Sequence, residues 1–148
     1  METTTMGKVM VTAKMENLDD LIGVQTGRNT TGTVRSVEVA DALVDTGANM
    51  LGMPKQLIAQ LGLLPFRTRT VRTAAGTVSV MIYQSVRVTV QGRDCNCDVM
   101  ELPDDCPVVI GQIPLEQLDF VIDPMKQRLI GNPDHGGQHM LDALSWGY

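Results

Sequence analysis

The tetrapeptide Asp45-Thr46-Gly47-Ala48 is the part of the sequence best suited to chemistry. It follows the apolar run Ala42-Leu43-Val44, which predicts a strand entering the interior. A carboxylate at the end of such a strand is expected to be partly buried, so that its surroundings can tune it as an acid or a base. Threonine adds a hydroxyl for local hydrogen bonds, and glycine allows another backbone to approach closely. The same residue types are common in solvated turns, so the tetrapeptide alone leaves both interpretations open.

Asp123 is the other aspartate that directly follows an apolar strand-like run, Phe120-Val121-Ile122. Pro124 stands where the small Thr-Gly pair follows Asp45. This position is better explained as the turn of a hairpin whose second strand is Arg128-Leu129-Ile130. The sequence therefore offers one strong candidate for an acidic catalytic residue in each chain.

The three cysteines, Cys95, Cys97 and Cys106, indicate reduced thiols rather than disulfides. Their number is odd, and the first ten residues lack the apolar core of a secretion signal. With His135 they could in principle hold a metal, but zinc sites usually separate paired cysteines by two or more residues. We therefore expect no metal and no other cofactor.

Composition limits the class of protein. The 148 residues suit one domain, 1–148, in which 132–148 form a C-terminal tail of uncertain structure. A net charge of −5 and only five aromatic residues argue against a nucleic-acid partner. No apolar run is long enough to cross a membrane, so the expected location is cytoplasmic.

Alternating and β-branched patterns predict a mostly β fold. One helix is expected to begin at Pro54, with an apolar stripe of Leu57, Ile58 and Leu61 and an end at Gly62. One more helical turn is expected over 114–118. The predicted strands cover 8–14, 34–39, 42–44, 67–72, 77–90, 95–102, 108–111, 120–122 and 128–130, and the 67–90 hairpin has Ala74-Ala75-Gly76 at its tip.

The order of these elements over Val34 to Gly131 resembles that of the retropepsin-like aspartic proteases, which include small bacterial members and the retroviral proteases. The resemblance implies a closed, barrel-like fold with one short helix, assembled as a homodimer. It also implies that Asp45 is catalytic and that the Thr46 hydroxyl ties the two active-site loops together. The residues expected to bind substrate are Thr46, Gly47, Ala48, and the flap tip Ala74, Ala75, Gly76 and Thr77. Family flaps are often richer in glycine, and the tail after Asn132 has no counterpart that can be placed.

The family's chemistry requires two carboxylates that share one proton, because like charges so close cannot both ionise. This chain has one Asp-Thr-Gly, so a twofold axis must bring two copies of Asp45 together. The expected activity is that of an aspartic endopeptidase acting on peptides or proteins. The alternatives are a non-proteolytic dimerisation or peptide-binding module on the same fold, and an unrelated small β-barrel with a chance motif.

Charge is unevenly distributed along the chain. From Thr46 to Arg93 there are six basic residues and no acidic one. The ordinary interpretation is a solvated basic edge. The alternative is a positive cleft that favours substrates with acidic residues and biases the aspartate pair toward losing its proton.

Overall fold

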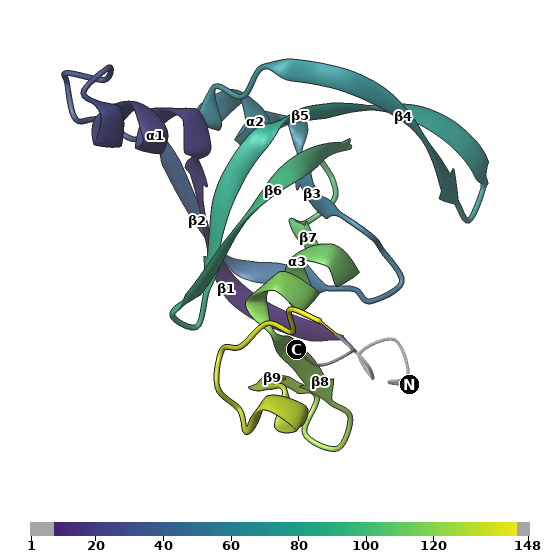
Figure 1. Cartoon of the computed structure of the whole chain (residues 1–148). Coiled ribbons are helices and arrows are strands. Elements are labelled where there is room, and N and C mark those ends of the chain that lie inside the picture. Colours follow the sequence, from purple (N-terminus) through teal and green to yellow (C-terminus); the bar gives the residue numbers. More distant parts are fainter. Residues whose placement is uncertain (1–7, 145–148) are drawn as a thin grey trace.

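The chain folds into a mostly β structure, and the computed structural model describes residues 8–144 (Figure 1). The strands are β1 (Val9–Asn17), β2 (Ser36–Val44), β3 (Leu51–Pro54), β4 (Pro65–Thr73), β5 (Gly76–Val90), β6 (Arg93–Leu102), β7 (Val109–Ile110), β8 (Phe120–Asp123) and β9 (Arg128–Gly131). The helices are α1 (Leu18–Thr26), α2 (Lys55–Leu61), α3 (Gln112–Leu118) and the 3-10 helix η2 (Pro133–His135). The mostly β prediction is confirmed, but the prediction of a single helix is wrong, because residues 8–144 contain three α-helices.

Six strands form a sheet that closes on itself. The sheet order is β1-β2-β7-β3-β6-β5-β4, and β1 pairs with β5 as well as with β2. The pairing of β1 with β5 joins Lys14–Asn17 to Val86–Thr89 and completes the ring. Strand β4 stays outside the ring and pairs with β5 alone, and β8 and β9 form a separate two-stranded sheet.

The core fills the inside of this ring. On β1 every second residue is buried, so Val9, Val11, Ala13 and Met15 face inward while their neighbours face out. Apolar residues of β3, β5, β6, α2 and α3 pack against them. Each fully buried aliphatic side chain contributes roughly 1.5–3 kcal/mol. The strand ends that carry the candidate site are therefore held by a continuous apolar core.

Helix α1 was not predicted, although its capping residues are visible in the sequence. The Asn17 side chain accepts a hydrogen bond from Asp20 N at 3.0 Å and so caps the helix, and Gly27 ends it with φ 78°. The buried Asn17 side chain also donates to the Leu61 carbonyl at 2.8 Å. One residue thus ends β1, begins α1 and fixes the last turn of α2.

The other two helices are close to their predicted positions. Helix α2 begins at Lys55, one residue later than predicted, because Pro54 is extended and ends β3; it ends before Gly62, as predicted. Helix α3 is longer than the single turn predicted over 114–118, since it begins at Gln112. No helix within residues 8–144 is long and apolar enough to cross a membrane.

The β4–β5 hairpin extends beyond the closed part of the sheet (Figure 1). Its outer half, from Gly76 to Met81 on β5, pairs only with β4. Both strands of this half are largely exposed. The hairpin is therefore an arm attached at its base, with the predicted small residues at its tip.

The C-terminal tail folds back onto the end of α3 through η2 and residues 136–144. Residues 145–148 of the predicted tail lie outside the described residues. The assignment of 1–148 to a single domain stays a prediction.

Candidate functional site

The loop from Asp45 to Met50 connects β2 to β3 and begins where β2 lies between two other strands. Val44 pairs with Val9 of β1 on one side and with Ile110 of β7 on the other. The Asp45 backbone N–H continues this ladder, since it donates to the Ile110 carbonyl at 3.0 Å. The start of the loop is therefore fixed by two neighbouring strands.

The Asp45 side chain is exposed in the single chain, so the expectation of a partly buried carboxylate is wrong for this state. The reason is that burial ends with Val44, and the chain turns out of the sheet immediately afterwards. Gly47 N donates to Asp45 Oδ1 at 2.9 Å, and Ala48 N donates to the Asp45 carbonyl at 3.1 Å. Within the described residues Oδ2 accepts no hydrogen bond. One carboxylate oxygen is thus held by its own loop, and the other is open.

Three substrate-binding candidates lie on this loop. Thr46 and Gly47 are exposed and Ala48 is half-buried. Within residues 8–144 the Thr46 hydroxyl makes no hydrogen bond, so the single chain leaves it free. A Cβ at Gly47 would meet only Asp45 Oδ1, at 3.1 Å. The Asp45 carboxylate and the backbone at Gly47 are therefore both accessible in the single chain.

Gly111 holds the far half of the loop, a role that the sequence analysis did not assign. Gly111 N donates to the Met50 carbonyl at 3.0 Å, and the next two N–H groups donate to the Ala48 and Asn49 carbonyls at 2.8 and 2.9 Å. A Cβ on Gly111 would lie 2.5 Å from the Met50 carbonyl oxygen. Only glycine permits this approach, and the glycine after the apolar run 108–110 was the available signal.

The flap candidates form the tip of the β4–β5 arm. Ala74 and Ala75 occupy the turn, and Gly76 adopts φ 124°. The Thr73 hydroxyl donates to the Gly76 carbonyl at 2.8 Å and accepts from Ala75 N at 3.2 Å. Residues Ala74 to Thr77 are all exposed. No hydrogen bond of the described residues joins this tip to the Asp45 loop, so each group is positioned by its own turn.

Asp123 occupies a turn, as its sequence context indicates. Its Oδ1 accepts hydrogen bonds from Met125 N at 3.0 Å and from Lys126 N at 3.4 Å. It ends β8 on the separate two-stranded sheet, while Asp45 follows β2 of the closed sheet. The carboxylate therefore stabilises the β8–β9 turn.

The cysteines are free thiols in the described part of the chain. A hydrogen bond with Cys97 lowers the pKa of Cys95, whereas the same bond together with burial raises the pKa of Cys97. Residues 8–144 contain no group of three or more His, Cys, Asp or Glu side chains placed to hold a metal ion. The structure thus does not bring Cys95, Cys97, Cys106 and His135 together as a metal centre.

A second cluster of titratable groups anchors the tail. The Asp119 carboxylate, 5% exposed, lies 2.7 Å from His135 Nδ1 and accepts hydrogen bonds from Met140 N at 3.1 Å and Asn132 Nδ2 at 3.3 Å. Arg93 donates to the Asp119 carbonyl at 2.7 Å and to the Gly137 carbonyl at 2.5 Å. The sequence analysis missed this network, since its members are 13 to 44 residues apart.

The two ionisable partners shift each other's pKa. Burial raises the pKa of Asp119, but the hydrogen bonds from His135, Met140 and Asn132 outweigh it and leave that pKa below its ordinary value. The Asp119 carboxylate raises the pKa of His135, and Asp142, whose carboxylate lies 3.2 Å from His135 Nε2, raises it further. The pair is therefore a structural ion pair at mildly acidic pH.

Comparison with known proteins gives a family match. A family model described as "Aspartyl protease" matches residues 30–132, which is more than half of the chain. The matched range contains the Asp45 loop, the β4–β5 arm and Gly111. A search of curated proteins found no match.

Proposed function

Because the chain belongs to the aspartyl protease family, we propose that it is an aspartic endopeptidase that cleaves peptide bonds as a homodimer. The observation that carries the proposal is the Asp45 carboxylate, which is held at one oxygen by Gly47 N and open at the other. The family match agrees with the resemblance of the sequence to the retropepsin-like proteases. In this proposal the closed ring of six strands is the barrel-like protease fold.

The reaction needs two carboxylates, and the second comes from another copy of the chain. When two Asp45 side chains meet across a twofold axis, one proton is shared between them. The ionised carboxylate takes a proton from water, which attacks the carbonyl carbon, while the protonated one hydrogen-bonds the carbonyl oxygen. Collapse of the tetrahedral species then transfers a proton to the leaving nitrogen.

The exposure of the loop supports a shared site. In the single chain the open oxygen of Asp45 and the free hydroxyl of Thr46 have no partner among residues 8–144. In the proposed dimer the second copy covers both, so that Thr46 joins the two loops and Asp45 becomes buried. The loop keeps its shape during this approach, because Gly111 and its neighbours already hold it.

The flap is part of the same proposal. The exposed tip Ala74–Thr77 belongs to an arm attached only at its base, so it can close over a bound peptide. With Gly47 and Ala48 it would contact the substrate backbone. This assigns the seven predicted binding residues to two surfaces, one on each side of an extended peptide.

The test is a peptide-cleavage profile of wild type beside Asp45→Asn, read by mass spectrometry from pH 3 to pH 8. We expect cleavage by wild type, a rate per subunit that rises with protein concentration, and no cleavage by a variant that still dimerises. Asp41→Asn is the matched control, since Asp41 is an exposed aspartate on β2, the strand that leads to Asp45. A wild type that dimerises and binds peptides but cleaves none over this range would instead be a non-proteolytic module.

A further inference from the structure

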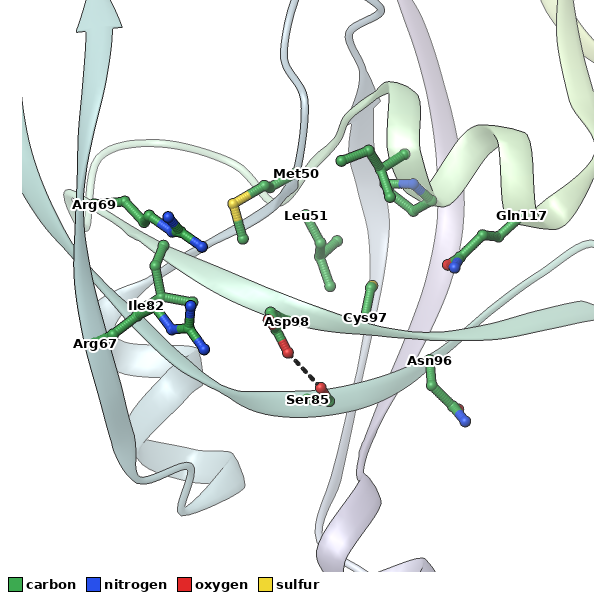
Figure 2. Close-up of a pocket in the computed structure, with 12 residues that line it drawn as sticks. Met50, Leu51, Arg67, Arg69, Ile82, Ser85, Asn96, Cys97, Asp98 and Gln117 are labelled. Atoms are coloured by element: carbon green, nitrogen blue, oxygen red, sulfur yellow. Dashed lines mark hydrogen bonds between the residues drawn. The ribbon is translucent and has the colours of Figure 1, made fainter.

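A cavity of about 360 Å³ lies beside the Asp45 loop, between the base of the β4–β5 arm, β6 and α3 (Figure 2). Arg67 and Arg69 lie on one side of it, and Gln117 of α3 lies on the other. The residues that line it are Met50, Leu51, Arg67, Arg69, Ile82, Ser85, Asn96, Cys97, Asp98, Ile113, Pro114 and Gln117.

Two of these residues connect the cavity to the candidate active site. Met50 is the last residue of the loop that begins with Asp45, and Ile113 N donates to the Asn49 carbonyl at 2.9 Å. A peptide that crosses the Asp45 loop in an extended conformation can therefore place a flanking side chain here. Leu51, Ile82 and Pro114 give the cavity an apolar lining suited to an aliphatic stem.

Two arginines give the cavity its charge. Arg67 and Arg69 are two residues apart on β4, so their side chains leave the same face of the strand. Both are exposed, and within residues 8–144 neither forms an ion pair with a carboxylate. Arg67 is oriented by Phe66, whose ring centroid lies 4.6 Å from its Cζ.

The acidic group in the cavity lining already has a partner. Asp98 Oδ1 accepts a hydrogen bond from the Ser85 hydroxyl at 2.6 Å. The cavity lining therefore holds one carboxylate and two guanidinium groups, and a net positive charge remains for a ligand.

The other basic residues of the 46–93 segment are placed differently. Lys55 lies 3.9 Å from Glu101, Arg87 donates to Asn96, and Arg93 donates to backbone carbonyls near the tail. Arg72 is exposed further along β4 and does not line the cavity. Arg67 and Arg69 are the pair that faces the cavity.

We propose that this cavity is a subsite for an acidic side chain of the substrate and that Arg67 and Arg69 determine the preference. The proposal rests on the proposed proteolytic function and names the substrate class. Guanidinium groups bind carboxylates through paired, charge-assisted hydrogen bonds. Glutamate fits better than aspartate, because its longer stem covers the apolar lining while its carboxylate reaches the arginines.

The test uses peptides in which each position flanking the scissile bond is in turn Glu, Gln or Lys. At one position we expect kcat/KM to be about tenfold higher with Glu than with Gln, as for one charge-assisted pair at a partly solvated site, with the ratio falling as salt rises. Arg67→Met with Arg69→Met should bring the ratio close to one. Arg128→Met, an exposed arginine on β9, is the matched control and should leave the ratio unchanged.

Equal rates for Glu and Gln at every position would overturn the subsite proposal and leave the proteolytic function standing. A Glu preference that survives in the double variant would also overturn it. Binding of the same peptides to Asp45→Asn, followed by fluorescence anisotropy, separates the two proposals. If wild type cleaves nothing but Asp45→Asn binds the Glu peptide more tightly in an Arg67- and Arg69-dependent way, the subsite stands and the proteolytic function fails.

Discussion

Two aspartates of this chain, Asp45 and Asp119, occupy similar places in the fold and opposite chemical environments. Each directly follows a regular element, β2 for Asp45 and α3 for Asp119. The side chain of Asp119 is buried, and three donors contact its two oxygens. The side chain of Asp45 is exposed, and it receives one hydrogen bond, from its own loop.

The difference shows how a fold separates a structural carboxylate from one available for chemistry. A buried carboxylate needs all its donors supplied by the protein, and Asp119 obtains them from the tail. The fold holds the backbone of Asp45 through Ile110 and the rest of its loop through Gly111, but it leaves one oxygen of the carboxylate open to solvent. We therefore expect changes at Asp119 to act on stability, and changes at Asp45 to act on activity.

The largest effect is expected from replacing each aspartate with asparagine. Asp45→Asn should lower cleavage by on the order of 10³-fold or more, because the amide cannot take a proton from water, while the melting temperature stays nearly unchanged. Asp119→Asn should lower the melting temperature by roughly 5 °C or more, because the charge that binds His135 is lost. Cleavage per folded molecule should be retained. Thermal melts and cleavage rates measured on both variants check this.

The opposite pattern, with Asp45→Asn unstable or Asp119→Asn stable and inactive, would contradict the assignment of roles. Asp41→Asn again serves as the control for the substitution itself, since it is exposed on β2.

The second largest effect is expected at two glycines, Gly111, which contacts the loop, and Gly47, which belongs to it. In Gly111→Ala the new Cβ would meet backbone atoms of residues 48–50, so we expect a loss of about 1–3 kcal/mol or more in the free energy of unfolding, together with lower cleavage. In Gly47→Ala the nearest atom is a carboxylate oxygen, so stability should change little. Denaturant unfolding of the pair measures this contrast. Equal destabilisation by both substitutions would contradict it.

An intermediate effect is expected from pH, acting on the tail. The pKa of His135 is raised on folding, so its stabilisation is complete below its ordinary value of 6.5 and disappears as pH rises through the raised pKa. The pKa of Asp119 is lowered, so its contribution is complete above 3.8 and disappears as pH falls through the lowered pKa. His135→Gln should therefore lower the melting temperature by a few degrees near pH 5 and by less at pH 9.

The charged groups that contact this pair are Asp142, on the tail, and Arg93, on β6. His139→Gln is the control, because His139 contacts the Gln117 carbonyl and no carboxylate of the described residues. A difference between wild type and His135→Gln that is the same at pH 5 and pH 9 would show that the ion pair does not anchor the tail.

The smallest effect is expected at Glu101. Its carboxylate is less buried than that of Asp119 and less exposed than that of Asp45. It accepts a hydrogen bond from the Tyr83 hydroxyl at 2.7 Å, and this bond raises the pKa of Tyr83. Tyr83→Phe should cost about 1 kcal/mol in the free energy of unfolding and leave cleavage unchanged. Denaturant titration measures the change in the free energy of unfolding, and the peptide assay measures cleavage. A change in cleavage would place this pair in the substrate path.

Local patterns predicted the parts of the fold that depend on neighbouring residues. The apolar approach to Asp45, the small-residue tip of the β4–β5 hairpin, helix α2 and the β8–β9 hairpin all follow from alternation and turn residues close in sequence. The first strand was predicted to end at Lys14, whereas β1 continues to Asn17, whose side chain contacts both α1 and α2.

The features that could not be predicted from the sequence depend on contacts between residues far apart in the chain. The ring closes only because β1 pairs with β5, about 70 residues later, and no local pattern indicates that partner. The hydrogen bonds of the Asp119 carboxylate also come from distant residues, because His135 and Met140 lie 16 and 21 positions later. The burial of Asp45 was predicted wrongly because the sequence shows that the strand is apolar but does not show where the loop leaves the sheet.

The closing of the sheet through β1 has a consequence for how the chain folds. During synthesis the N-terminal strand is made first, and one of its two partners, Val86–Thr89, is made much later. Until then the inward side chains Val9, Val11, Ala13 and Met15 have no complete core to enter, and an unpaired strand edge remains. Such distant pairing slows folding, so the nascent chain passes through a stage in which it can associate with other chains before the ring is complete.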